Sequence, residues 1–348
     1  MKRRFNALLS QAWQTGDERQ VLALFEEAIV IADRFLTETD AYEARIGYTR
    51  RAVEFGFYER MFVSFAWCWS KFLRNPGRYS GFYMLWQFKW IIGNLWKCTA
   101  FPLEQLEGLF ALFREYCAKY GYSPRPGYGA CHSMMLGIGR PAEADECYRL
   151  WRTARRDALA NCPACERHAM GTYYIEKGQY RRGLQILRPI LEGGLSCSSV
   201  PGSTYEAAVR AYMALGRIED ARAYADRASR ELKGSGSLYE FGTLIAFYAI
   251  ANRRKALRLL RNTYPYVRLP VSDWEKLHYL VGVQFLLDQE GGAWRRTGSA
   301  LPEPDRAWVR AEIERLAKAF DERNRNRHVS RRVEELGKRY AAWKAALR

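Results

Sequence analysis

Apolar residues recur along the chain at the three- and four-residue spacing of α-helices, in paired segments joined by short polar turns. Residues 42–73 form one such pair that turns near Gly56, and residues 79–119 form another whose second half begins within "TAFPLEQLEGLF". This spacing places one side of each helix in a core. The pattern predicts an all-α protein built from antiparallel helical hairpins.

Four later segments share one short pattern: Gly or Ala, four intervening residues, then a small residue. They are "GRPAEA" (139–144), "GQYRRG" (178–183), "GRIEDA" (216–221) and "ANRRKA" (251–256), and their starts are 39, 38 and 35 residues apart. Glycine at a turn allows a left-handed backbone, and a small residue five positions later lets the second helix approach the first. A spacing of this length is typical of stacked helical hairpins.

The four segments resemble the tetratricopeptide repeat, which has glycine at the turn, a small residue five positions later and an aromatic residue four positions before. Tyr174, Tyr212 and Phe247 fill the aromatic position, Gly183, Ala221 and Ala256 fill the small one, and Gly171 matches the glycine of the first helix. The family's helix-ending proline is mostly missing, and the spacings exceed its usual length of about 34 residues. The resemblance covers residues 126–260 and implies a right-handed superhelix, or solenoid.

This organisation predicts N-terminal helical hairpins over residues 1–125, a tetratricopeptide-like array over 126–290 and a basic helical tail over 305–348. Two segments rich in Gly, Ser and Pro, residues 193–203 and 289–305, are predicted breaks. In the tail, one apolar stripe with coiled-coil spacing comprises Val329, Val333, Leu336, Tyr340, Trp343 and Leu347. The stripe either packs back onto the last repeat as a cap, or forms a homodimer seam or a partner helix.

Lys and Arg exceed Asp and Glu by 17, which favours contact with nucleic acid or anionic surfaces. Most of this excess is spread along the chain, and no nucleic-acid-binding module is recognisable. The most apolar stretch, residues 82–96, contains Gln87, Lys89 and Asn94, so we expect a buried helix and no membrane span.

The chain has eight cysteines and no secretory signal at its amino terminus, which predicts a reducing, cytoplasmic compartment. Five of the cysteines stand singly in helical patterns and are expected to be small buried thiols: Cys68, Cys98, Cys117, Cys131 and Cys147. No common catalytic signature is present, and His132, His278 and His328 lie where structural roles are expected. We therefore predict that the chain is not an enzyme.

The segment "CPACERH" (162–168) gathers candidate metal ligands. Pro163 suits the first turn of a helix and Cys162 its cap, where the helix dipole favours a thiolate. Cys162, Cys165 and His168 lie close along this helix, and Cys197 follows the paired helix and would return to the same end of the hairpin. A Cys₃His set is the chemistry of structural zinc. Packed thiols without a metal, and a disulfide or redox pair, stay open because only one Cys-x-x-Cys is present.

The resemblance also implies a concave groove lined by the first helix of each repeat. These groove positions are Thr172, Ile175, Glu176, Glu206, Arg210, Met213, Phe241, Ile245 and Tyr248. A mixed apolar and charged groove suits an extended peptide or a helix, so we predict a protein- or peptide-binding scaffold or regulator. Similar arrays occur in bacterial peptide-sensing regulators. The groove could instead be filled by the chain's own tail, and a nucleic-acid-binding repeat or an accessory subunit of a separate enzyme are the alternative functions.

Overall fold

The computed structural model describes residues 1–198, 200–289 and 305–347. These residues form seventeen α-helices and three short 3₁₀ helices, without a β-strand among them, which confirms the all-α prediction. The chain divides into two compact units: Met1–Ala160 with Pro270–Ser272, and Asn161–Leu269 with Asp273–Arg348. The predicted break at 289–305 lies almost entirely outside the described residues.

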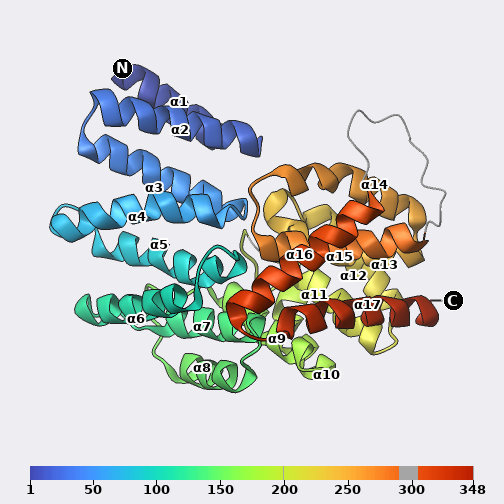
Figure 1. Ribbon diagram of the computed structural model, residues 1–348. Coiled ribbons are helices and arrows are strands. Elements are labelled where there is room, and N and C mark those ends of the chain that lie inside the picture. Colours follow the sequence, from blue (N-terminus) through green and yellow to red (C-terminus); the bar gives the residue numbers. More distant parts are fainter. Residues whose placement is uncertain (199, 290–304, 348) are drawn as a thin grey trace. The chain divides into compact units, whose positions relative to one another are not determined.

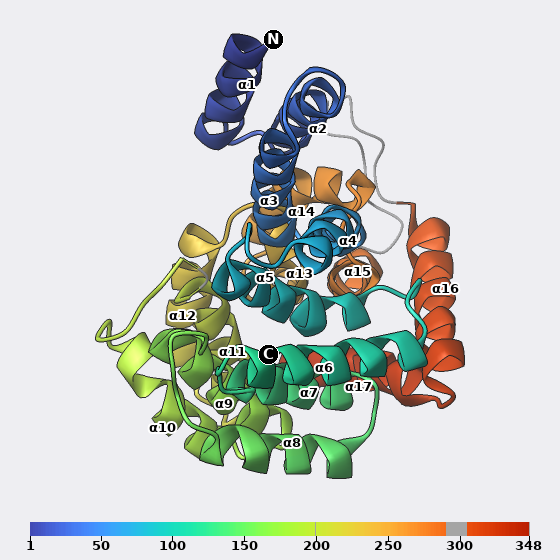
Figure 2. The ribbon, with the colours of Figure 1, turned by 90° about the vertical axis from the view of Figure 1, so that its left-hand side faces the viewer.

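Unit 1 is a succession of helices in which chain neighbours pack together (Figure 2). They are α1 (Lys2–Gln14), α2 (Glu18–Phe35), α3 (Glu38–Glu54), α4 (Tyr58–Arg74), α5 (Gly81–Asn94), η1 (Leu95–Lys97), α6 (Leu103–Lys119), α7 (Arg125–Gly137) and α8 (Pro141–Thr153). The hairpin predicted over 42–73 is α3 and α4, and Gly56 between them has a positive φ of 77°. The predicted hairpin over 79–119 is α5 and α6.

Unit 2 contains the remaining hairpins and the tail (Figure 1). Its helices are α9 (Pro163–Glu176), α10 (Tyr180–Leu191), α11 (Gly202–Ala214), α12 (Ile218–Glu231), η2 (Ser235–Ser237), α13 (Leu238–Ala251), α14 (Arg253–Thr263), η3 (Tyr264–Arg268), α15 (Asp273–Gln289), α16 (Arg306–Asn324) and α17 (His328–Ala346). The first of the four repeat segments therefore lies in unit 1 and the other three in unit 2.

The repeat turns have the backbone that their glycines predict. Gly139, Gly178 and Gly216 each follow the first helix of a hairpin and have φ of 81°, 73° and 70°. The fourth turn uses a different device, because α13 runs to Ala251 and the side chain of Asn252 accepts a hydrogen bond from the Lys255 amide at 3.1 Å. Asn is a strong helix cap, so this hairpin needs no left-handed glycine.

Small residues allow close helix contacts at two places in unit 2. A Cβ atom added to Gly183 of α10 would lie 2.9 Å from the carbonyl oxygen of Gly171 on α9. A Cβ atom added to Gly282 of α15 would lie 2.6 Å from the carbonyl carbon of Gly242 on α13. Since real Cβ atoms do not approach backbone so closely, α13 and α15 meet backbone to backbone at these glycines.

The tail helix α17 belongs to unit 2 and packs against α13 and α15. Four residues of its predicted apolar stripe are buried: Val329, Leu336, Tyr340 and Trp343. The ring of Trp343 lies 6.4 Å from that of Phe247 on α13, and Tyr340 lies 5.5 Å from Phe285 on α15. These contacts use the stripe within one chain, so they favour the cap over the dimer seam.

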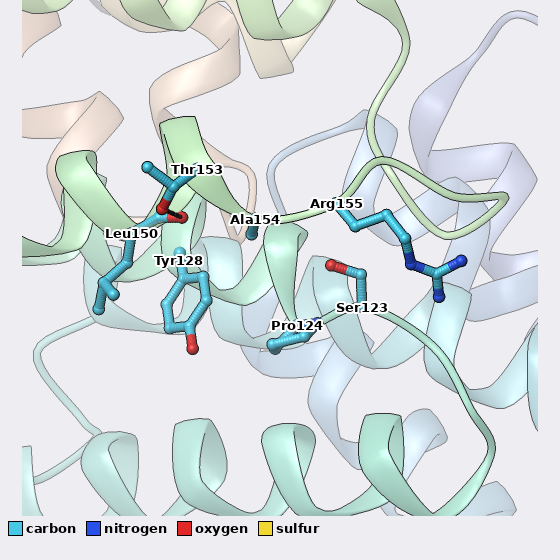
Figure 3. A pocket seen from close by; sticks show the side chains of 7 residues that line it. All are labelled: Ser123, Pro124, Tyr128, Leu150, Thr153, Ala154 and Arg155. Carbon is cyan, nitrogen blue, oxygen red and sulfur yellow. Dashed lines mark hydrogen bonds between the residues drawn. The ribbon is translucent and has the colours of Figure 1, made fainter.

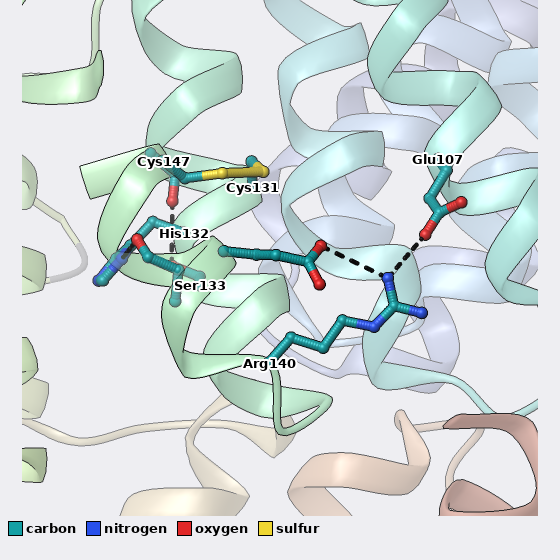
Figure 4. The surroundings of a disulfide bond; sticks show 9 residues. Glu107, Cys131, His132, Ser133, Arg140 and Cys147 are labelled. Carbon is teal, nitrogen blue, oxygen red and sulfur yellow. Dashed lines mark hydrogen bonds and ion pairs between the residues drawn. A yellow bond between two sulfur atoms is a disulfide. The ribbon is translucent and has the colours of Figure 1, made fainter. Parts of the chain in front are cut away.

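The cysteines depart in one respect from the expected pattern. Cys68, Cys98 and Cys117 are buried thiols as predicted, but Cys131 of α7 and Cys147 of α8 form a disulfide, with their Cα atoms 6.0 Å apart (Figure 4). The prediction of single buried thiols is wrong for this pair, because the hairpin register places the two side chains opposite each other. None of the helices in the described residues combines the length and apolar character required to span a bilayer.

Candidate functional site

Three cysteine thiols gather at one end of the α9–α10 hairpin. Cys162 is the N-cap of α9, and its sulfur accepts a hydrogen bond from the Cys165 amide at 3.3 Å. Cys197 returns in the loop after α10, where a short bridge to Val200 holds the backbone. The Sγ atoms of Cys165 and Cys197 are 3.2 Å apart, and all three sulfurs lie within 4.8 Å of one another.

The position and exposure of these thiols suit a metal ion. Soft thiolate sulfurs select zinc, copper(I) and related ions over hard cations. Cys162 is exposed and the other two are half-buried, and the packed residues beside them are Ala164, Ile190 and Val200. Burial and the neighbouring thiols raise the pKa of Cys165 far above its ordinary value. The group could bind a metal, whose positive charge would replace the proton.

The fourth predicted ligand, His168, lies outside this group of ligand atoms. Its Nδ1 is 2.9 Å from the hydroxyl oxygen of Thr204 on α11. Burial and the nearby Arg210 lower the pKa of His168 to about 4, so the ring is neutral at physiological pH. The structure thus assembles three of the four predicted ligands. The sequence did not reveal Thr204 as an alternative partner, because it comes from the next hairpin.

A buried charge cluster lies among the predicted groove positions. Arg210 of α11 donates from Nε to Glu206 at 2.9 Å and also pairs with Glu176 at the end of α9. The other oxygen of Glu176 faces Arg332 of the tail helix α17, with 3.4 Å between Nη1 and Oε2. Two carboxylates and two guanidiniums therefore share one site, and one of the guanidiniums comes from the tail.

The surroundings of Arg332 complete this cluster. Its Nε donates to Nε2 of His278 at 3.1 Å, and its Nη2 lies 3.4 Å from the hydroxyl of Tyr239. His278 uses its other ring nitrogen, Nδ1, to donate to the Trp274 carbonyl at 2.8 Å. Burial and Arg332 lower the pKa of His278 to about 3, so the ring is neutral and can accept.

The guanidiniums keep the Glu176 carboxylate ionised. Burial works to raise the pKa of Glu176, but Arg332 and Arg210 outweigh it and hold the pKa well below its usual range. Burial works to lower the pKa of Arg332, but the attraction of Glu176 and Tyr239 together outweighs it and raises the pKa above its ordinary value. Glu176, Arg210 and Arg332 are therefore charged at neutral pH.

Most of the predicted groove positions are closed to solvent. Ile175, Glu206, Arg210, Met213, Phe241, Ile245 and Tyr248 are each at most 4% exposed, while Thr172 and Glu176 are half-buried. The hydroxyl of Tyr248 donates to Asp226 of α12 at 2.5 Å. The ion pair between Arg332 and the groove position Glu176 favours the alternative in which the chain's own tail fills the groove. Sequence reasoning assigned no role to Arg332, although its place on a helix with an apolar stripe was visible.

Open clefts also lie elsewhere in the described residues. In unit 1, a cleft of about 380 Å³ lies beside the start of α7 and the end of α8, and its one cation, Arg155, is 3.6 Å from Asp157 (Figure 3). Beneath it, the guanidinium of Arg125 donates to two carbonyls at the end of α8, those of Trp151 and Ala154, both at 2.7 Å. In unit 2, a larger cleft of about 630 Å³ is formed by α10, α11 and α12.

In comparisons with known proteins, no family model and no curated protein matches the chain.

Proposed function

We propose that the chain is a binding scaffold or regulator that holds a helical peptide segment on its groove positions. The observation that supports this most directly is the way α17 is held: Arg332 pairs with the groove position Glu176. Beside it, Trp343 and Tyr340 contact Phe247 of α13 and Phe285 of α15. An amphipathic helix lying in a groove is a common mode of peptide recognition. A partner would bind in place of α17.

The cluster also defines what such a partner carries. Without Arg332, Glu176 and Glu206 would face Arg210 alone, so a replacing segment must bring a cation to this point. Two aromatic side chains, eight and eleven residues further along the helix, would take the places of Tyr340 and Trp343. The partner is thus a basic, aromatic-bearing helix, and acidic segments are disfavoured.

We further propose that the hairpins belong to a right-handed, tetratricopeptide-like superhelix. The left-handed turn glycines support this, as do the close contact of Gly171 with Gly183 and the complete burial of Ala221 and Ala256 at the small positions. Each of these features matches the position that the repeat pattern assigns to it.

The binding proposal can be tested with a fluorescein-labelled peptide containing residues 326–347, added to the full-length chain and followed by fluorescence anisotropy. In the wild type, the attached tail competes with the peptide. Trp343→Ala weakens the attached tail, because truncating a buried Trp costs about 3–5 kcal/mol. We expect this variant to bind the peptide at least about tenfold more tightly than the wild type.

Controls separate displacement from unfolding. Arg331→Ala changes an exposed neighbour on the same helix and should bind the peptide as the wild type does. A peptide with Arg332→Glu should bind the Trp343→Ala chain at least about tenfold more weakly, because it places a carboxylate against Glu176. Circular dichroism of Trp343→Ala tests whether this variant retains its helices. Equal affinity of wild type and Trp343→Ala would show that the groove positions do not exchange helices.

We also propose that Cys162, Cys165 and Cys197 hold a structural zinc ion. The thiols fit this ion because the start of α9 and the loop after α10 bring their three sulfurs within 4.8 Å of one another. One of the sulfurs also accepts a hydrogen bond from a backbone amide. Structural zinc sites have four ligands, so a water molecule or an added side chain would complete the set. The ion would join the start of α9 to the loop after α10.

Elemental analysis of purified full-length protein tests the zinc proposal. We expect one zinc ion per chain in the wild type, and its loss in Cys197→Ser. Cys117→Ala, which changes a buried thiol of α6 outside the cluster, should keep the metal. Metal-free wild type, purified without chelators under reducing conditions, would contradict the proposal.

A further inference from the structure

The open cleft of unit 2 lies on the side of the hairpins formed by their second helices. It has a volume of about 630 Å³ and is lined by α10, the end of α11 and the first half of α12. Its residues are separate from the charge cluster and from the three thiols. Nothing in the proposed groove function uses this surface.

The cleft contains many hydrogen-bond donors that the protein itself does not satisfy. Arg181 makes no hydrogen bond or ion pair with the described residues. Among the described residues, Arg188 and Arg217 each donate only from Nε, toward Glu192 at 2.7 Å and Asp220 at 2.8 Å. All three arginines line the cleft, and their terminal amino groups are available to a ligand.

Two tyrosines add hydroxyl donors and a flat aromatic wall. The rings of Tyr212 and Tyr224 are stacked, with centroids 5.5 Å apart and an angle of 12° between their planes. The guanidinium of Arg217 lies 4.8 Å from the centre of the Tyr212 ring. Neither hydroxyl donates to an acceptor in the described residues, and burial raises the pKa of both, which keeps them protonated.

Part of the cleft lining is apolar. Three leucines, Leu184, Leu191 and Leu215, line the cleft beside the tyrosines, and we call them the leucine floor. Leu184, Tyr212 and Tyr224 pack against a buried core that includes Leu187 and Ala208. Arginines beside a rigid apolar surface are a typical setting for a specific contact, because little conformational entropy is lost when a ligand binds.

We propose that this cleft binds an acidic peptide segment that carries an apolar anchor side chain. Three arginines and one glutamate line the cleft, so its charge complements aspartate and glutamate. Carboxylates accept from guanidinium and tyrosine donors in strong charge-assisted hydrogen bonds. The leucine floor takes the apolar anchor.

A peptide fits these observations better than a nucleic acid does. The two tyrosine rings already stack on each other, and Arg217 already covers Tyr212, so these faces are occupied within the protein. Base binding needs open aromatic faces, one for each stacked base. The leucine floor also has a counterpart in an apolar side chain and none in a phosphate backbone.

Fluorescence anisotropy on the full-length chain tests the proposal with a short labelled peptide made only of Glu, Asp and Leu. A second peptide, with Gln and Asn in place of Glu and Asp, controls for the apolar part. We expect the acidic peptide to bind and the neutral one to bind at least about tenfold more weakly. Arg181→Ala should weaken acidic-peptide binding about tenfold, the effect of losing one charge-assisted contact.

Tyr224→Phe tests the hydroxyl without changing the packing and should weaken acidic-peptide binding severalfold. Arg258→Ala, which removes an exposed arginine of α14 outside the cleft, should leave the affinity unchanged. Equal binding by wild type and Arg181→Ala overturns the site, and equal binding of both peptides overturns its acidic specificity. Preference for a single-stranded oligonucleotide over the acidic peptide overturns the class of ligand. Binding of the tail peptide should not respond to Arg181→Ala, so this site and the groove can fail independently.

Discussion

Replacing Arg332 with Met removes the cation that the tail supplies to the buried cluster while keeping most of the apolar stem. The change breaks three polar contacts: with Glu176 at 3.4 Å, with His278 at 3.1 Å and with Tyr239 at 3.4 Å. It also leaves a buried carboxylate with one guanidinium partner where it had two. We expect the substitution to weaken the packing of α17 and to lower the free energy of unfolding of unit 2.

The size of this cost follows from the geometry. Removing one member of a buried ion pair typically costs about 3–5 kcal/mol, and a hydrogen bond to a charged group contributes about 1.5–3 kcal/mol. The cost at this site is smaller than either typical energy, because the side chains of Arg332 and Glu176 remain 21% and 20% exposed and two of the three polar contacts are long. We expect Arg332→Met to lower the free energy of unfolding by about 2 kcal/mol.

Urea denaturation followed by circular dichroism measures the loss, and hydrogen exchange of peptides from α17 locates it. Arg331→Met on the exposed side of the same helix is the matched control. A double-mutant cycle with Glu176→Gln isolates the pair: once Arg332 is Met, the cost of Glu176→Gln should fall by about 1 kcal/mol. A loss below about 0.5 kcal/mol for Arg332→Met, or additive effects in the cycle, would refute this account of the cluster.

Three further predictions concern stability. Gly183→Leu forces a side chain against Gly171 and should cost at least about 1–3 kcal/mol in thermal or urea unfolding, whereas an unchanged midpoint would mean that α9 and α10 can separate. Cys147→Ala removes the disulfide with Cys131, which closes a loop of 16 residues, and should lower the free energy of unfolding by about 3 kcal/mol. Unfolding with and without reductant checks this, since reductant should destabilise only the wild type. The folded protein keeps His278 neutral, because its pKa is lowered to about 3, whereas the unfolded chain binds a proton there below a pKa of about 6.5. The free energy of unfolding is therefore highest above about pH 6.5 and falls as the pH drops below that value. His278→Gln should lose less stability than the wild type between pH 7 and about 4, and equal losses would show that this ring does not bind the proton.

The sequence predicted the local features of the fold well, because they depend on short-range physics. Glycine between two helical segments predicts a left-handed turn, so Gly139, Gly178 and Gly216 could be placed as hairpin turns. A small residue five positions after the turn glycine predicts a close helix contact, as Gly183 shows. The grouping of Cys162 and Cys165 with the distant Cys197 also followed, because an antiparallel hairpin brings its two ends together.

Features that depend on the rotation of one helix against another were not predictable in the same way. The disulfide between Cys131 and Cys147 requires two side chains to face each other across a hairpin, and helical periodicity alone does not fix that register. His168 contacts Thr204 on a later helix, a contact that the spacing of its own segment cannot show. The contact between Glu176 and Arg332 depends on where α17 docks, which the sequence left as one of two alternatives.

The contact between Gly242 and Gly282 has a consequence for how this protein can change over evolutionary time. A turn glycine such as Gly216 has open space around its Cβ position, so asparagine, which tolerates a left-handed backbone, could replace it at small cost. At Gly242 and Gly282 the obstacle is backbone on both sides, and no adjustment of a neighbouring side chain can relieve it. Neither position can acquire a side chain unless α13 and α15 move apart. Descendant sequences should therefore keep both glycines, even where the turns and the surface around them have diverged.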